Sequence, residues 1–67
     1  MKIFCERLKE LRSEKNLSTT ELGKCLDVKN STITRWENGQ RVPSIDHLYD
    51  IAKFFGVTSD YLIGLED

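Results

Sequence analysis

The chain has 67 residues, of which 39% are hydrophobic and 31% charged, and its formal net charge is −1. A chain of this length forms one small domain, which we expect to span residues 1–67. Its apolar runs are too short to cross a bilayer, and charged residues follow the first four residues where a signal peptide would continue with an apolar core. The composition therefore argues against a membrane partner and predicts a cytoplasmic location.

The near-neutral charge also argues against a protein that coats nucleic acid indiscriminately. The charges are, however, unevenly distributed. Residues 29–41 contain Lys29, Arg35 and Arg41 against one acidic residue, whereas residues 42–67 contain one lysine against five acidic residues. A local basic patch on a weakly charged chain favours a selective binder.

Residue patterns for catalysis or metal binding are scarce. No nucleophile stands with a base, no glycine-rich phosphate loop is present, and no paired carboxylates surround an obvious pocket, so we expect neither enzymatic activity nor a cofactor. Cys5 and Cys25 lack partners at zinc spacing, and a cytosolic protein keeps such thiols reduced, so we predict packing residues rather than a redox sensor or metal site. The single histidine, His47, is expected to be a surface residue.

Helical periodicity predicts a first helix over residues 4–15, with an apolar stripe that begins at Phe4 and Leu8 and faces the core. Ser18 and Glu21 then have the spacing of a capping box, in which the serine hydroxyl and the glutamate carboxylate each accept a backbone hydrogen bond. A second helix therefore begins at this point and ends near residue 26.

Gly23 lies within this second helix, where glycine costs ~1 kcal/mol relative to alanine. A glycine at that cost needs a reason, and we expect the close approach of another helix. Residues 27–30 leave only a short connection before the next helical pattern, and helices joined so tightly cross steeply. The pattern predicts a helix, a tight turn and a second helix.

The segment from Ser31 to Gly39 predicts a third helix with two different faces. Ile33 and Trp36 share one face, and their spacing favours a core position for the indole over a stacking platform for a base. The other face carries four polar side chains at helical spacing: Ser31, Thr34, Arg35 and Asn38. A polar face with an arginine can read base edges in a DNA major groove, although alone it also fits an ordinary solvated helix.

Two more helices follow. Residues 40–43 include a proline and cannot continue a helix, and Ser44 can cap the next helix, over residues 45–55. Gly56 ends it, and a threonine or serine at 58 or 59 caps a short last helix before Gly64. The fourth helix has a broad apolar stripe: Ile45, Leu48, Tyr49, Ile51, Ala52 and Phe55. Five helices fill the chain and no strand pattern competes.

Residues along almost the whole chain match one family pattern in order and spacing. They are Leu17-Ser18, Glu21-Leu22, Leu26, Val28, Ser31-Thr32-Ile33, Arg35-Trp36-Glu37-Asn38-Gly39, Pro43-Ser44 and Gly56-Val57. From about residue 4 to residue 64 the chain resembles the lambda-repressor-like, Cro/C1-type (XRE) helix-turn-helix domain. The resemblance implies an all-α, compact five-helix fold with its helix-turn-helix at about residues 18–38.

The resemblance also implies roles for single residues. The residues nearest the bases are Lys29, Asn30, Ser31 and Arg35, and these side-chain types can hydrogen-bond base edges. The residues at the DNA backbone are Ser18, Thr19, Thr34, Asn38, Gly39 and Arg41. Thr34 can contact either a phosphate or a thymine methyl group. Arg12 and Glu37 match positions that form an ion pair orienting the recognition helix, which Ile33 and Trp36 seat on the core.

Three positions depart from the family pattern. Thr19 stands where many relatives have glutamine, so a contact to both a phosphate and the first base is not carried over. Asp27 replaces a common glycine and is expected near the left-handed conformation, which aspartate tolerates better than most residues. Lys29 replaces a capping serine, so Asn30 is a candidate helix cap instead of a base reader.

The sequence therefore predicts a sequence-specific regulator of transcription, a repressor that binds a pseudo-palindromic double-stranded DNA operator without a small-molecule ligand. A homodimer is expected, with one or two side chains of the last helix at the contact and the others in the core. The candidates are Tyr61, Leu62, Ile63 and Leu65. The alternative function is a protein-interaction module of the same fold, an antitoxin or adaptor with secondary or no DNA binding.

Overall fold

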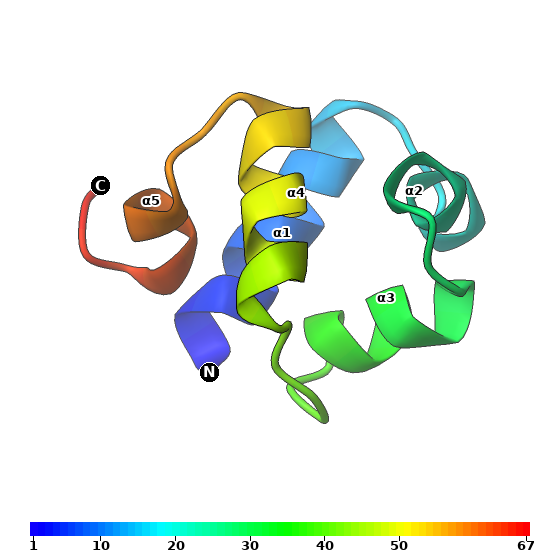
Figure 1. Ribbon diagram of the computed structural model, residues 1–67, viewed down its shortest axis with the longest axis horizontal. Helices are drawn as coiled ribbons and strands as arrows, with labels where there is room; N and C mark the ends of the chain where they lie inside the picture. The colour runs from blue at the N-terminus through cyan, green and yellow to red at the C-terminus, as the bar shows by residue number, and fades with distance from the viewer.

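The computed structural model describes residues 1–67 and contains five helices and no strand. The helices are α1 (Lys2–Glu14), α2 (Thr19–Leu26), α3 (Asn30–Glu37), α4 (Ile45–Phe55) and α5 (Ser59–Ile63). In Figure 1, α1 and α4 occupy the centre, α2 and α3 lie to one side of them and α5 to the other. The predicted number and order of helices are confirmed. No helix combines the length and the apolar character needed to cross a bilayer.

All five helices contribute to a single hydrophobic core. Its nine buried residues are Phe4, Leu8, Leu22, Leu26, Ile33, Trp36, Ile51, Ala52 and Leu62. Burying a large apolar side chain contributes about 1.5–3 kcal/mol, so this core is the main source of stability. The predicted core positions of Ile33 and Trp36 on the third helix are confirmed, since they are 0% and 2% exposed.

Side-chain caps begin three of the helices. The Ser18 hydroxyl accepts from the Glu21 N–H at 3.0 Å, and the Glu21 carboxylate accepts from the Ser18 N–H at 2.8 Å. The predicted capping box is therefore present, and the hydrogen bond from the Ser18 backbone lowers the pKa of Glu21. Ser44 caps α4 as predicted, and Thr58 caps α5.

The close approach of another helix expected at Gly23 is present in part, because a Cβ atom there would lie 3.4 Å from the backbone nitrogen of Asn30, the first residue of α3. A Cβ atom at this position would lie 2.6 Å from the Val28 carbonyl oxygen, which belongs to the turn after α2 and not to another helix. The same turn returns a hydrogen bond from the Val28 N–H to the Gly23 carbonyl oxygen at 2.8 Å. Gly23 therefore allows the turn to fold tightly against its own helix, which local periodicity does not reveal.

The packing role predicted for the two cysteines holds only in part. Both are free thiols. Cys5 is half-buried, and its Sγ donates a hydrogen bond to the Met1 carbonyl oxygen at 3.0 Å. Cys25 is exposed, because it falls outside the stripe of α2 that carries Leu22 and Leu26 into the core.

Candidate nucleic-acid interface

A tight turn sets α3 at a steep angle to α2 (Figure 1). Asp27 ends α2 in the left-handed conformation with φ 59° and ψ 44°, as the sequence predicts. The backbone is extended again at Lys29, which is the N-cap of α3. The short connection restricts the direction of α3, because only the three residues from Asp27 to Lys29 separate the two helices.

An ion pair fixes the far end of α3 to α1. Arg12 Nε donates to Glu37 Oε2 at 2.6 Å, and Arg12 Nη2 donates to Glu37 Oε1 at 3.0 Å. The third nitrogen, Nη1, donates to the Leu17 carbonyl oxygen at 2.8 Å, in the connection between α1 and α2. The side chains are 17% and 6% exposed. The hydrogen bond to Glu37 raises the pKa of Arg12, and the pair implied by the family resemblance is present in the structure.

The face of α3 opposite Ile33 and Trp36 is fully accessible. Ser31, Thr34 and Arg35 are exposed on this face, and the exposed C-cap residue Asn38 continues it. Thr34 Oγ1 donates a hydrogen bond to the Asn30 carbonyl oxygen at 3.1 Å, so its hydroxyl hydrogen is used within the helix. The guanidinium of Arg35 makes no ion pair with another side chain.

The expectation that Asn30 caps α3 was wrong. Lys29 holds the N-cap position without a side-chain hydrogen bond, and Asn30 is the first helical residue. The backbone at Lys29 is extended, with φ −73° and ψ 151°, so the helix begins at Asn30. A cap at Asn30 would make it begin one residue later. Lys29, Asn30 and Ser31 are all exposed, so their side chains gather at the N-terminal end of α3.

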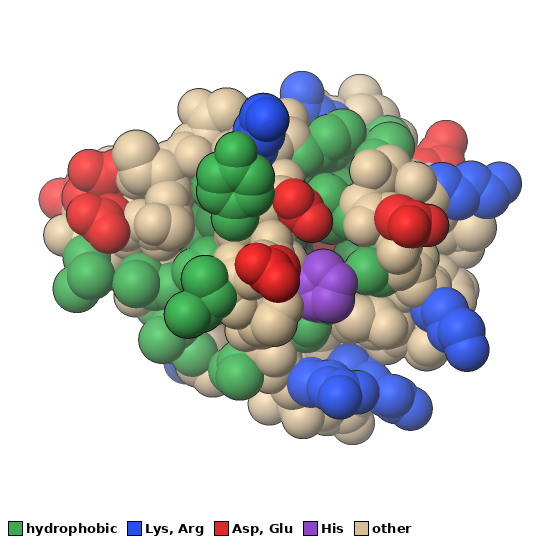
Figure 2. All heavy atoms as spheres, in the orientation of Figure 1, with side chains coloured by type: hydrophobic (Ala, Val, Ile, Leu, Met, Phe, Trp, Pro, Cys, Tyr) green, Lys and Arg blue, Asp and Glu red, His purple; other side chains and the backbone are tan.

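The residues implied at the DNA backbone, apart from Thr34 within α3, lie at or beyond helix ends. Ser18 and Thr19 begin α2, and the hydroxyl of Ser18 is also the acceptor of the capping box. Asn38, Gly39 and Arg41 follow α3, where Gly39 takes a φ of 75°. Figure 2 shows basic side chains along the lower edge, near α3, and at the right and top edges, while acidic side chains lie over α4, at the C-terminal end and over α2.

The apolar residues of the last helix divide between the core and the surface. Leu62 is 0% exposed and belongs to the core, so it is one of the side chains that complete the monomer. Tyr61 and Ile63 are half-buried, and the guanidinium of Arg7 lies 4.2 Å from the centre of the Tyr61 ring. Leu65 is 73% exposed.

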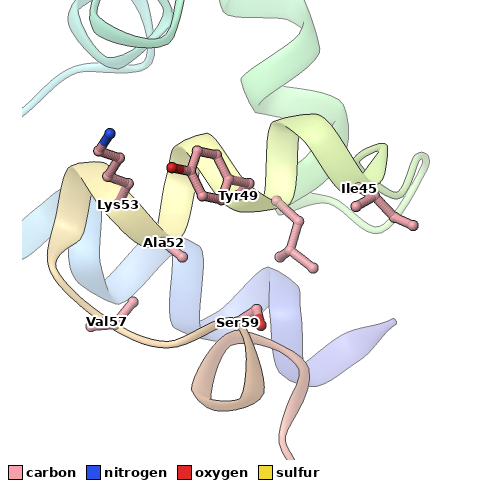
Figure 3. Close-up of a pocket in the computed structure, with 7 residues that line it drawn as sticks. Ile45, Tyr49, Ala52, Lys53, Val57 and Ser59 are labelled. Atoms are coloured by element: carbon pink, nitrogen blue, oxygen red, sulfur yellow. The ribbon is translucent and has the colours of Figure 1, made fainter.

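The structure instead exposes apolar side chains on α4. Ile45 is 85% exposed and Tyr49 is 61% exposed. They border a groove of about 500 Å³ between α4 and the segment that leads into α5. Figure 3 shows Ile45 and Tyr49 projecting from α4 on one side of the groove, with Val57 and Ser59 on the other. Their helical spacing placed them in the apolar stripe of the fourth helix, and only the packing shows that this stripe is wider than the surface it covers.

His47 was also misplaced by the sequence pattern. It is half-buried rather than on the open surface, and the centre of its ring lies 5.3 Å from that of Trp36. Its Nδ1 is 3.2 Å from the Ser44 hydroxyl oxygen. The residue lies in the first turn of α4, on the side that faces α3. Helical spacing alone does not show that this side contacts another helix.

Comparisons with known proteins agree with this architecture. Residues 8–62 match the helix-turn-helix family HTH_3. The chain is 41% identical over 64 residues to the transcriptional activator BcrR of Enterococcus faecalis, covering 96% of this chain and 31% of that protein. It is 39% identical over 61 residues to the regulator MJ0272 of Methanocaldococcus jannaschii, covering 91% and 92% of the two chains.

A solved structure extends the similarity to the fold. The P22 c2 repressor in complex with a synthetic operator superposes with a TM-score of 0.86 at 27% identity, over 92% of this chain and 94% of that one. The present chain spans only part of several curated relatives, with 31% of BcrR and 53% of the regulator AnsR of Bacillus subtilis covered. From residue 8 to residue 62, the chain belongs to the Cro/C1-type (XRE) helix-turn-helix family.

Proposed function

We propose that this chain is a sequence-specific, double-stranded DNA-binding regulator of transcription that places α3 in the major groove. One observation carries the proposal. The apolar side of α3 is locked into the core by Ile33 and Trp36, while its opposite face offers only exposed polar side chains. Because the helix is already held in place, little conformational entropy of α3 is lost when its hydrogen-bonding groups contact base edges.

The proposed base readers are Lys29, Asn30, Ser31 and Arg35. Arg35 can bind O6 and N7 of guanine with two hydrogen bonds, and the Asn30 amide can pair with adenine. No cap at the start of α3 uses the Asn30 side chain, which supports its availability for a base. Lys29 and Ser31 can each serve a neighbouring base or phosphate.

Thr34 is proposed to contact thymine through its methyl group. Its hydroxyl donates to the Asn30 carbonyl oxygen, and a hydroxyl that has used its hydrogen cannot donate to a phosphate. The methyl group is then the free part of the side chain on the exposed face. Apolar contact with the C5-methyl group of thymine is an established form of base recognition.

Phosphate contacts are proposed at both sides of α3. At the start of α2, the Ser18 amide is used by Glu21, and the Thr19 amide and the helix dipole can attract an anion at Ser18 and Thr19. At the other side, Asn38, Gly39 and Arg41 follow the C-terminal end of α3. Such contacts fix the register of the protein on the duplex, while the base contacts provide the discrimination.

We further propose that two copies bind a pseudo-palindromic operator. The support is the exposed apolar side chains of Ile45 and Tyr49, which border the groove beside α4, and the exposed Leu65 after α5. Exposed apolar side chains gathered along a groove, as Ile45 and Tyr49 are, are typical of an interaction site. A two-fold contact through this surface would present two copies of α3 to successive turns of the duplex.

Repression is the proposed outcome, and it results when the bound protein occupies a promoter. This outcome follows the similarity to the P22 c2 repressor, although BcrR is an activator. The proposed location is the cytoplasm. The groove beside α4 also supports a second candidate function, a module that binds a protein partner. That alternative predicts stable co-purification of a partner and no shift of any DNA fragment.

Selection of operators from random double-stranded DNA with purified protein tests the main proposal. We expect enrichment of a half-site repeated in inverted orientation, with the two half-site centres about 10 base pairs apart. Failure to enrich any half-site at low salt would exclude sequence-specific recognition. Enrichment of single, unpaired half-sites would support base recognition by α3 and would contradict binding as a homodimer.

A further inference from the structure

We propose that His47 is a positioning residue for the recognition helix. Its imidazole ring, held by Ser44 at the start of α4, packs on Trp36 and sets the tilt of α3 relative to the rest of the domain. The inference rests on the proposed function, because its consequence is measured as recognition of DNA.

Two hydrogen-bonding contacts hold the ring in place. Ser44 Oγ accepts the backbone N–H of His47 at 3.1 Å as the cap of α4, and the same oxygen lies 3.2 Å from Nδ1 of the ring. The backbone and the side chain of His47 are thus tied to one hydroxyl group. A ring fixed at its own helix end is a firm surface for a neighbouring side chain.

That neighbouring side chain is the indole of Trp36. The two ring centres are 5.3 Å apart and the ring planes are tilted by 57°, a favourable separation for aromatic groups. Trp36 is 2% exposed and is part of the buried face of α3. The contact therefore joins the buried face of α3 to the first turn of α4.

The other sides of α3 are fixed in different ways. Its N-terminal end follows the tight turn at Asp27, and its C-terminal end is tied to α1 through Glu37. On the side of α4, the structure has an open hollow of about 710 Å³. Its lining comes from the turn, α3, the loop before α4 and the first turn of α4, and includes Thr32, Trp36, Arg41 and His47. The contact between the two rings bridges α3 and α4 beside this hollow.

The tilt of α3 matters more for base contacts than for phosphate contacts. Hydrogen bonds to base edges weaken steeply when their angle or length departs from the ideal. The attraction between basic side chains and phosphates depends mainly on charge and tolerates small displacements. Loss of the His47 ring is therefore expected to reduce the preference for an operator while leaving the affinity for random DNA almost unchanged.

The test compares His47→Ala with His47→Phe, which keeps an aromatic ring but lacks Nδ1. Affinity for the selected operator and for random DNA is measured by fluorescence anisotropy at a temperature where thermal melts show each variant fully folded. We expect His47→Ala to bind the operator about tenfold more weakly, with random DNA changed less than about twofold. His47→Phe should recover most of the operator affinity.

Trp36 provides a second readout, because it is the only tryptophan in the chain and its emission reports on the surroundings of the indole, of which the His47 ring is a part. We expect His47→Ala to shift that emission to longer wavelength as water reaches the indole, and His47→Phe to restore it. Unchanged operator preference in His47→Ala, equal losses on operator and random DNA, or a His47→Phe variant as weak as His47→Ala would each overturn the inference. A wild-type protein that prefers no operator would overturn the proposed function and this inference together.

Discussion

Arg12 and Glu37 join the first helix to the third through two parallel hydrogen bonds of 2.6 and 3.0 Å. The pair lies directly after the helix turn that carries Arg35, and Arg12 also holds the carbonyl oxygen of Leu17. Planar, two-point recognition of this kind restricts rotation as well as distance. The ion pair therefore fixes the angle at which α3 is presented, in addition to any stability it provides.

Breaking this pair from one side is expected to destabilise the domain. Arg12→Ala leaves a carboxylate that is 6% exposed without its partner, and we expect a loss of about 2–4 kcal/mol in the free energy of unfolding. Replacing both residues by methionine should cost much less, because no charge remains buried. Urea denaturation of Arg12→Met, Glu37→Met and the double methionine variant measures the coupling free energy of the pair, and a loss below about 0.5 kcal/mol in Arg12→Ala would contradict the prediction.

The capping box predicts a pH dependence of stability. The pKa of Glu21 is lowered from its ordinary value of 4.5 in the folded protein by hydrogen bonds from Ser18, so folding favours the carboxylate form. Its contribution is complete above pH 4.5 and is lost as the pH falls through the lower, folded pKa. Melting of Glu21→Gln should therefore occur below that of the wild type at pH 7 and approach it in strong acid. A constant difference at all pH values would exclude this contribution.

Substitutions in the groove beside α4 test dimer formation separately from the stability of the fold. Ile45 and Tyr49 are exposed in the monomer, so Ile45→Lys combined with Tyr49→Lys should leave the melting temperature nearly unchanged. We expect the double variant to bind a full operator no better than a half-site, as measured by anisotropy, and to sediment as a monomer. Leu62→Ala is the matched core control, with an expected loss of about 2–5 kcal/mol in stability. Full operator affinity in the double variant would place the dimer contact elsewhere.

The thymine contact of Thr34 can be tested at one methyl group. Replacement of each operator thymine by deoxyuridine removes only the C5-methyl group, and we expect a loss of about threefold to tenfold at one position in each half-site. Thr34→Val keeps a methyl group and should retain this discrimination, whereas Thr34→Ser should remove it. If no thymine methyl group contributes, or if the serine variant discriminates like the wild type, Thr34 does not read thymine.

The fold was predictable because its determinants are local. Ser18, Ser44 and Gly56 mark helix ends through bonds and backbone angles that involve only nearby residues. The ion pair was implied by the family resemblance, since nothing in the spacing of two residues 25 positions apart reveals their contact. Periodicity places Ile45 and Ile51 in one apolar stripe, but the packing buries only Ile51.

The candidate site was predictable to a similar degree. The polar face of α3 follows from helical spacing. That Lys29 and not Asn30 is the N-cap residue depends on the backbone path through the turn, which the spacing does not show. The contact between Trp36 and His47 depends on how two helices pass each other, and each residue alone has an ordinary pattern. Contacts that form only when distant segments meet are those that the sequence did not reveal.

The most direct test of the central claim is the effect of Arg35→Ala on the selected operator and on random DNA under the same salt conditions. Arg35 is exposed in the middle of the polar face, and its loss should not alter the fold. The account predicts about 1–3 kcal/mol weaker binding to the operator and relaxed base preference at one position, with little change on random DNA. Equal losses on both DNAs would show that Arg35 contacts phosphate and would contradict base reading by this face of α3.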